Sequence, residues 1–179
     1  MSRIDYSRIE LLVLDVDGVM TDGRITLTPA GEEIKSFHVR DGSGMKYWQR
    51  VGKKIAILTG RGSPAVLRRA EDLGVDVVRL NCKDKLPAYE QVLSELGVSD
   101  EQTAVVGDDL PDLPLVRRAA LGVATADAVE ELRREADHVT QLPGGEGCVR
   151  EVIEMILKRA GLWQKVLERY QSVEKGVEE

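Results

Sequence analysis

Two aspartates, Asp15 and Asp17, close an apolar run in the segment LLVLDVDGVMTDG. That segment contains no Lys or Arg that could neutralise them. Carboxylates held close together repel each other, and a cation bound among them relieves the repulsion. Oxygen ligands of this hard type favour Mg²⁺, which commonly takes further ligands from a phosphate group. The segment therefore indicates a site where acidic side chains meet a divalent cation.

Three further motifs carry chemically useful side chains, and each follows a different apolar run. The residues are Thr59, Gly60 and Arg61 after KIAIL, Lys85 after VDVVRL and the loop NCKDK, and Asp108, Asp109 and Asp112 after TAVVG. A hydroxyl, a free backbone N–H and an ammonium group, together with Mg²⁺, can hold a phosphoryl dianion. The combined pattern therefore indicates chemistry on a phosphate group.

Each of these motifs is ambiguous when it is taken alone. An aspartate at the end of a strand is commonly a helix cap, and we expect Asp112 to be a cap or to support the site from behind. Lys85 by itself also fits the solvated start of a helix. The phosphate interpretation rests on the four motifs occurring together, each after a separate strand.

The elements that must position these residues alternate between strands and helices. Short apolar runs predict strands at residues 9–15, 54–58, 75–80, 103–107 and 121–125. Helical spacing of apolar residues predicts helices at 64–74, 85–97, 111–119 and 127–136. The runs are mostly continuous, which is typical of a parallel sheet buried on both faces. We expect an α/β doubly wound domain whose ligand site lies at the carboxyl ends of the strands.

Two segments stand outside this alternation. GRITLTPAGEEIKSFHVRDG predicts a β-hairpin inserted after the first strand, at about residues 23–40. Residues 162–179 predict an amphipathic helical tail that could dock on the body or on another subunit. We therefore expect one domain over residues 1–161, followed by this tail.

Bulk composition excludes several other classes. The chain has 179 residues, 42% of them hydrophobic and 31% charged, with a net charge of −6. There is no basic stretch suited to nucleic acid, no apolar run long enough to span a bilayer and no signal-peptide core. The two cysteines form no metal-type cluster, which favours a reducing, cytoplasmic location.

The motifs resemble those of phosphatases of the haloacid dehalogenase (HAD) superfamily that lack a large cap. The resemblance covers residues 9–160 and rests on DVDGVMTDG, ILTGR and GDDLPDL. The pieces GEEIKSFHVRDGSG and ADHVT…PGGEGCVREV resemble the branch that hydrolyses sugar-acid phosphates such as 3-deoxy-D-manno-octulosonate 8-phosphate (KDO 8-phosphate), a precursor of lipopolysaccharide.

This resemblance implies a HAD-like Rossmannoid fold and a mechanism through an aspartyl phosphate. Asp15 would be the nucleophile, and Asp17 the general acid and then the general base. Mg²⁺ would be held by Asp15, Asp108 and the backbone oxygen of Asp17. Thr59 and Lys85 would stabilise charge on the transferring phosphoryl group. Asp109 would orient Lys85 or a metal-bound water.

The resemblance also implies how the substrate is bound. The family forms homotetramers through the hairpin, and its subunits complete each other's sites. The implied substrate contacts, beyond Asp17, Thr59, Gly60 and Lys85, are His38, Val39, Arg40, Asp41, Gly42, Lys46, Arg61 and Arg69.

Three departures from the family pattern concern substrate identity. Lys46 stands where Arg is usual, Glu146 where many members have Arg, and Asn81 where many have Gly. A lysine cannot grip a carboxylate with two hydrogen bonds as arginine does. A phosphatase for KDN 9-phosphate or a related nine-carbon sugar acid is therefore an alternative.

A phospho-receiver signalling domain is an alternative from another class. It also uses an acidic cluster, a Thr, a Lys and Mg²⁺ on a doubly wound sheet. A receiver carries its phosphoacceptor aspartate at the third strand, whereas here that strand ends at Leu80 and Asn81. The order of the motifs therefore favours an enzyme with catalytic turnover over a receiver domain.

Overall fold

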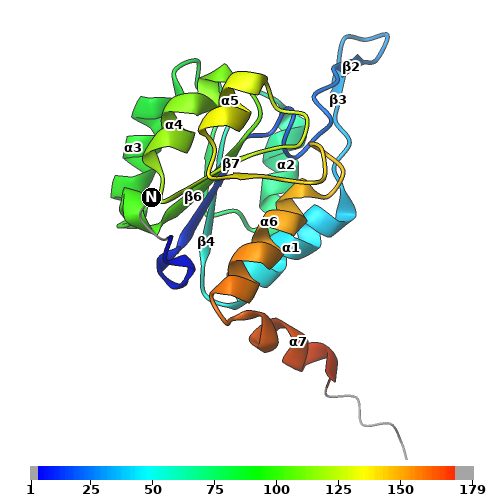
Figure 1. Cartoon of the computed structure of the whole chain (residues 1–179). Helices are drawn as coiled ribbons and strands as arrows, with labels where there is room; N and C mark the ends of the chain where they lie inside the picture. The colour runs from blue at the N-terminus through cyan, green and yellow to red at the C-terminus, as the bar shows by residue number, and fades with distance from the viewer. Residues whose placement is uncertain (1–3, 172–179) are drawn as a thin grey trace, which may run out of the picture.

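A six-stranded parallel sheet forms the centre of the molecule in a computed structural model that describes residues 4–171 (Figure 1). The strand order is β5-β4-β1-β6-β7-β8, with consecutive neighbours parallel. The strands are β1 (Leu11–Leu14), β4 (Lys54–Leu58), β5 (Val77–Arg79), β6 (Thr103–Gly107), β7 (Leu121–Ala124) and β8 (His138–Val139). The order reverses on either side of β1, which places the carboxyl end of β1 at the switch point where such sheets bind ligands.

Helices cover both faces of this sheet. The helices before the C-terminal tail are α1 (Val39–Arg50), α2 (Pro64–Leu73), α3 (Lys85–Leu96), α4 (Leu113–Arg118), α5 (Glu130–Glu135) and α6 (Cys148–Arg159). Three short 3₁₀ turns are formed by Tyr6–Arg8, Asp100–Gln102 and Leu110–Asp112. Helices α1, α2 and α6 pack with Leu12 and Leu14 of β1, and α3, α4 and α5 pack with Leu11 and Val13. Alternate residues of β1 thus enter separate cores, as strand geometry requires.

The predicted strands are confirmed, with ends that differ by one or two residues. Helix α5 is shorter than expected, and the segment 111–119 divides into a 3₁₀ turn and α4. The pattern did not predict β8, α1 or α6. Helix α1 contains two glycines, and it is held by packing against α6 rather than by propensity.

The inserted hairpin is confirmed but is shorter than its sequence span. Its strands are β2 (Thr26–Leu27) and β3 (Glu33–Ile34), paired antiparallel. Figure 1 shows the hairpin projecting beyond the end of the sheet. Ile25, Leu27 and Ile34 are exposed in this single chain.

Helix α7 (Trp163–Gln171) extends from the opposite end of the molecule (Figure 1). The guanidinium of Arg150 lies over the rings of both Tyr47 and Trp163, at 4.5 and 5.7 Å from their centroids. These contacts dock α7 on α1 and α6; the rest of the predicted tail, residues 172–179, lies outside the described residues. Across residues 4–171, no helix has both the length and the apolar character needed to span a membrane.

Candidate active site

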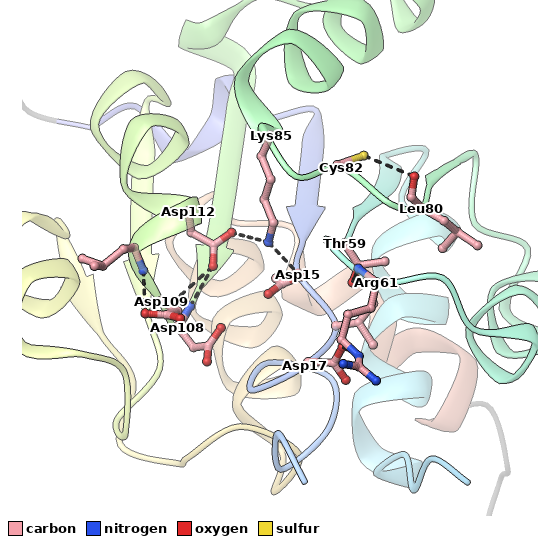
Figure 2. A network of polar contacts seen from close by, with 12 residues as sticks. Asp15, Asp17, Thr59, Arg61, Leu80, Cys82, Lys85, Asp108, Asp109 and Asp112 are labelled. Atoms are coloured by element: carbon pink, nitrogen blue, oxygen red, sulfur yellow. Dashed lines mark hydrogen bonds and ion pairs between the residues drawn. The ribbon is translucent and has the colours of Figure 1, made fainter. Parts of the chain in front are cut away.

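The four sequence motifs meet in one cavity of about 480 Å³ at the carboxyl ends of the strands. Its walls include Asp15, Asp17, Thr59, Gly60, Arg61, Lys85, Asp108, Asp109 and Asp112. Gly23, Cys82, Lys83 and Pro111 also line it, and the motifs did not single them out. Figure 2 shows the charged side chains converging from separate loops.

Lys85, the first residue of α3, is buried between two carboxylates. Its Nζ atom lies 2.6 Å from Oδ1 of Asp112 and 2.9 Å from Oδ1 of Asp15 (Figure 2). Burial disfavours the ammonium charge, but Asp112 and Asp15 outweigh burial and raise the pKa of Lys85. Lys85 is therefore a fixed positive charge beside the expected nucleophile.

Asp112 uses both of its carboxylate oxygens to hold this arrangement. Oδ1 accepts the hydrogen bond from Lys85, and Oδ2 accepts the backbone N–H of Asp108 at 3.1 Å. Asp109 instead accepts the N–H of Leu110 at 2.8 Å and begins the 3₁₀ turn. In this structure Lys85 is thus oriented by Asp112 and not by Asp109, which corrects that part of the expectation.

The residues present fit a divalent cation. Carboxylate oxygens of Asp15, Asp108 and Asp112 lie within 4.8 Å of one another. Oδ1 of Asp108 is buried and has no hydrogen-bond partner among residues 4–171. Because the oxygens of Asp112 are already engaged, Asp15 and Asp108 are the side chains that can ligate a metal ion.

The electrostatics of these two carboxyls also favour a cation. Burial, with the nearby charge of Asp112, raises the pKa of Asp15 to about 6. Burial, with the charges of Asp15 and Asp112, raises the pKa of Asp108 to about 8. Burial and the clustering of the carboxylates therefore destabilise their charged forms, and a bound cation would oppose both effects.

Thr59 is held at the cavity wall by backbone contacts to the neighbouring loop. Its N–H donates to the carbonyl of Arg79 at 3.0 Å, and its carbonyl accepts the N–H of Cys82 at 2.9 Å. Asn81, between those two residues, has a positive φ of 58°, which Asn tolerates better than most non-glycine residues. This backbone conformation is the physical reason why Asn can replace Gly at this point.

The side chain of Asp17 turns away from Asp15 and toward the hairpin. Lys35 donates a hydrogen bond to Oδ1 of Asp17, and Arg61 Nε lies 3.7 Å from Oδ2. Since β1 ends at Leu14, the two aspartates lie in the loop after the strand, and their carboxylates bind different partners. The sequence motifs did not point to Lys35, because a lone lysine in a hairpin carries no spacing signal.

Seven of the predicted substrate-binding residues lie outside this cavity in the single chain. They are His38, Val39, Arg40, Asp41, Gly42, Lys46 and Arg69. Lys46 donates to the carbonyl of Leu73 at 2.6 Å and so caps α2, and Arg69 stacks over the ring of Phe37. Buried Asp41 accepts the N–H of Arg150 at 2.7 Å and caps α6.

A second cavity, of about 390 Å³, lies beside the start of α6. Arg40, Glu146 and Arg150 line it, together with Glu151 and Glu154. Two of the sequence features that concerned substrate choice, Arg40 and Glu146, therefore share this cavity and are absent from the walls of the first one.

The GGEG loop before α6 packs against the loop that carries Asp15 and Asp17. The N–H of Gly145 donates to the carbonyl of Val19 at 2.9 Å. A Cβ atom at Gly144 would lie 1.9 Å from the carbonyl oxygen of Gly18. Only glycine fits at this approach, so the late motif fixes the loop that carries Asp15 and Asp17.

Comparisons with known proteins agree with this geometry. Residues 77–151 match the family model of haloacid dehalogenase-like hydrolases. The chain is 42% identical over 153 residues to the 3-deoxy-D-manno-octulosonate 8-phosphate phosphatase of Haemophilus influenzae, covering 86% of this chain and 85% of that protein. It is 44% identical over 151 residues to the phosphatase of the same name from Yersinia pestis, covering 84% and 81%.

A solved structure gives the same result. It is the phosphatase of that name from Moraxella catarrhalis, in complex with a magnesium ion, a phosphate ion and a KDO molecule. Its sequence is 38% identical to this chain. The two structures superpose with a TM-score of 0.90, over 93% of this chain and 95% of that one. The identity and coverage are high enough to fix the family as well as the fold. The chain is therefore a haloacid dehalogenase-like hydrolase and belongs to the family of 3-deoxy-D-manno-octulosonate 8-phosphate phosphatases.

Proposed function

We propose that this protein is a Mg²⁺-dependent phosphomonoesterase that hydrolyses KDO 8-phosphate to KDO and inorganic phosphate. The observation that carries the proposal is the placement of Lys85 between Asp15 and Asp112, with Asp108 in the same cavity. A nucleophilic carboxylate, a buried cation and a metal-ligating carboxylate are the groups that phosphoryl transfer needs. The relatives that share the family hydrolyse this ester, according to their names.

The first half of the reaction breaks the bond between phosphorus and the sugar oxygen. A carboxylate oxygen of Asp15 attacks phosphorus and forms an acyl phosphate, and Asp17 gives its proton to the departing sugar oxygen. Lys85 and Thr59 stabilise the negative charge on the transferring oxygens. Gly60 offers a backbone N–H in the same cavity.

The second half releases the phosphate. Asp17, now a carboxylate, takes a proton from a water molecule that attacks the phosphorus of the acyl phosphate. The bond to Asp15 breaks, and inorganic phosphate leaves with both Asp15 and Asp17 restored for the next cycle. The engagement of Asp112 with Lys85 keeps the ammonium group in place through both halves.

Asp15 and Asp108 would hold the Mg²⁺ ion, with the backbone oxygen of Asp17 as a third ligand expected from the family resemblance. When bound, the ion neutralises the carboxylates and polarises the phosphoryl oxygens. The relative from Moraxella catarrhalis was solved with a magnesium ion, a phosphate ion and KDO.

The residues that select the sugar acid form a separate part of the proposal. Arg61 lies in the cavity and is half exposed, so it can reach an anionic group of the substrate. Val39 and Arg40 are exposed, and we propose that they, with His38, Asp41, Gly42, Lys46 and Arg69, act where subunits meet. A nine-carbon sugar-acid phosphate, such as KDN 9-phosphate, is the second candidate, because Lys46 and Glu146 depart from the family pattern.

We further propose a homotetramer assembled through the hairpin. Exposed Ile25, Leu27 and Ile34 would lose their contact with water in such an assembly. We treat residues 1–161 as one phosphatase domain and residues 162–179 as its tail. We also propose a cytoplasmic location, which the two free cysteines support.

The test is release of inorganic phosphate, with Mg²⁺ and with EDTA, from a panel of esters. The panel holds KDO 8-phosphate, KDN 9-phosphate, N-acetylneuraminate 9-phosphate and plain sugar phosphates. A strong Mg²⁺-dependent preference for KDO 8-phosphate supports the proposal, and preference for a nine-carbon acid replaces it with the second candidate. Stoichiometric labelling by acetyl phosphate without turnover would overturn the proposed catalytic hydrolysis.

A further inference from the structure

Four charged side chains join the hairpin to the two catalytic loops. Lys35 and Glu33 belong to the hairpin, Asp17 follows β1 and Arg61 follows β4. Lys35 contacts Asp17 and lies 3.5 Å from Glu33, while Arg61 lies 2.9 Å from Glu33 and 3.7 Å from Asp17. Two positive and two negative groups thus alternate in a closed ring, so the network is electrically balanced.

Burial identifies Lys35 as the fixed member of this network. Its side chain is 1% exposed, whereas that of Arg61 is 49% exposed. A buried ammonium group paired with two carboxylates is held strongly, because moving it would leave a charge unpaired. Lys35 is not among the residues that line the cavity, so it does not face a bound ester directly.

The two oxygens of Asp17 have different surroundings. Oδ1 accepts the hydrogen bond from Lys35. Oδ2 is buried and has no hydrogen-bond partner in the described part of the chain. Asp17 lines the cavity, so the contact with Lys35 fixes the orientation of a carboxyl group that borders the space where an ester would bind. Its Oδ2 lies 3.7 Å from Nε of the half-exposed Arg61.

We propose that Lys35 is a positioning residue that holds the Asp17 carboxyl in the orientation needed for proton transfer to the leaving group. The hairpin then takes part in catalysis within its own subunit, in addition to any role in assembly. The inference rests on the proposed phosphatase function and adds one residue to it. Proton transfer depends steeply on orientation, so a freely rotating carboxyl would be a poorer acid catalyst.

The leaving group provides a test that a general structural defect would not mimic. A sugar alkoxide needs a proton as it departs, whereas p-nitrophenolate leaves readily without one. In the presence of Mg²⁺, Lys35→Met should lower kcat/KM about 100-fold for the preferred sugar-acid phosphate. The same variant should change kcat/KM for p-nitrophenyl phosphate less than about threefold, because kcat/KM reports only the steps up to departure of the leaving group.

Three control variants accompany this measurement. Lys35→Arg keeps the positive charge and should restore most of the activity on the sugar-acid phosphate. Arg24→Met removes an exposed cation at the base of the same hairpin, whose ion pair within residues 4–171 is with Asp22, and should leave kcat/KM for both esters unchanged. Asp17→Asn combined with Lys35→Met should be no slower than Asp17→Asn alone if Lys35 acts through Asp17. If Lys35→Met does not fold, Lys35→Gln takes its place.

The outcomes separate this inference from the proposed function. A wild-type protein without Mg²⁺-dependent phosphatase activity would overturn the proposed function and the inference with it. An active wild type in which Lys35→Met lowers kcat/KM equally for both esters, or for neither, would overturn the positioning role alone. A fully additive double variant would also count against it.

Discussion

The ammonium group of Lys85 and the carboxylate of Asp112, 27 residues apart in sequence, form a buried pair with 2.6 Å between Nζ and Oδ1. The second oxygen of Asp112 accepts the N–H of Asp108, an expected metal ligand. One aspartate therefore orients both the ammonium group beside Asp15 and the loop that carries Asp108.

We predict that Asp112→Asn lowers kcat on the preferred substrate by about 10- to 100-fold. The amide keeps the shape of the side chain but removes the charge that holds Lys85, and an underpaired buried group costs about 1–3 kcal/mol. Steady-state phosphate release is the measurement. Asp109→Asn is the matched control, because Asp109 lines the same cavity without contacting Lys85. Equal losses in the two variants would contradict the special role of Asp112.

Replacement of Asp15 by Asn should abolish turnover and leave the fold intact. An amide oxygen is a poor nucleophile and cannot form the acyl phosphate, while its shape matches that of the carboxyl group. Loss of phosphate release, with an unchanged circular dichroism spectrum, is the expected result. Substantial residual phosphatase activity would rule out Asp15 as the nucleophile.

Affinity for Mg²⁺ should weaken as the pH falls from about 8 to about 6. In the metal-free protein the pKa of Asp108 is raised to about 8 and that of Asp15 to about 6, so protons compete with the ion over this range. Each displaced proton changes the affinity by up to about tenfold per pH unit. Calorimetric titration in buffers of different ionisation enthalpy measures both the affinity and the protons released.

The raised pKa values of Asp15 and Asp108 also determine how the free energy of unfolding changes with pH. A carboxyl whose pKa is raised by folding is costly to ionise in the native state, so the metal-free protein loses stability as the pH rises through this range. The increase in Tm on adding Mg²⁺ should therefore be larger near pH 8 than near pH 6. Asp108→Asn should remove most of that pH dependence, and an unchanged dependence would contradict the assignment.

Gly144→Ala should destabilise the catalytic loop and lower activity. The added methyl group would lie 1.9 Å from the carbonyl oxygen of Gly18, so the backbone must shift, at a cost of about 1–3 kcal/mol or more. Thermal unfolding and phosphate release are the measurements. Ser94→Ala is the control, because Ser94 is an exposed residue of helix α3, where the backbone conformation suits alanine. A Gly144→Ala protein as stable and active as the control would show that the close approach is unimportant.

The exposed apolar residues of the hairpin should determine the oligomeric state. We expect Leu27→Ser with Ile34→Ser to shift the protein from a tetramer toward smaller species in light scattering, because both side chains are more than half exposed in the single chain. Leu67→Ser on α2 removes a similarly exposed leucine and should leave the mass unchanged. A wild-type monomer would overturn the proposed assembly.

The sequence by itself determined five of the six strands of the sheet and the loops that follow them. Continuous apolar runs such as residues 54–58 and 103–107 indicate strands that are buried on both faces of a sheet. Such a run can be recognised from a few consecutive residues. Each of the motifs at Asp15, Thr59, Lys85 and Asp108 comes after the end of a different predicted strand. Parallel order then requires them to meet at one edge, so the cavity could be predicted before any contact was known.

The tertiary structure decided which charges pair. Lys85 pairs with Asp112 and not with the nearby carboxylate of Asp109, because Asp109 caps the 3₁₀ turn that follows it. Lys35 reaches Asp17 across 18 residues, and Asp41 caps α6 across 109 residues. Such pairs depend on how helices and loops pack in three dimensions, and no spacing along the chain records that packing.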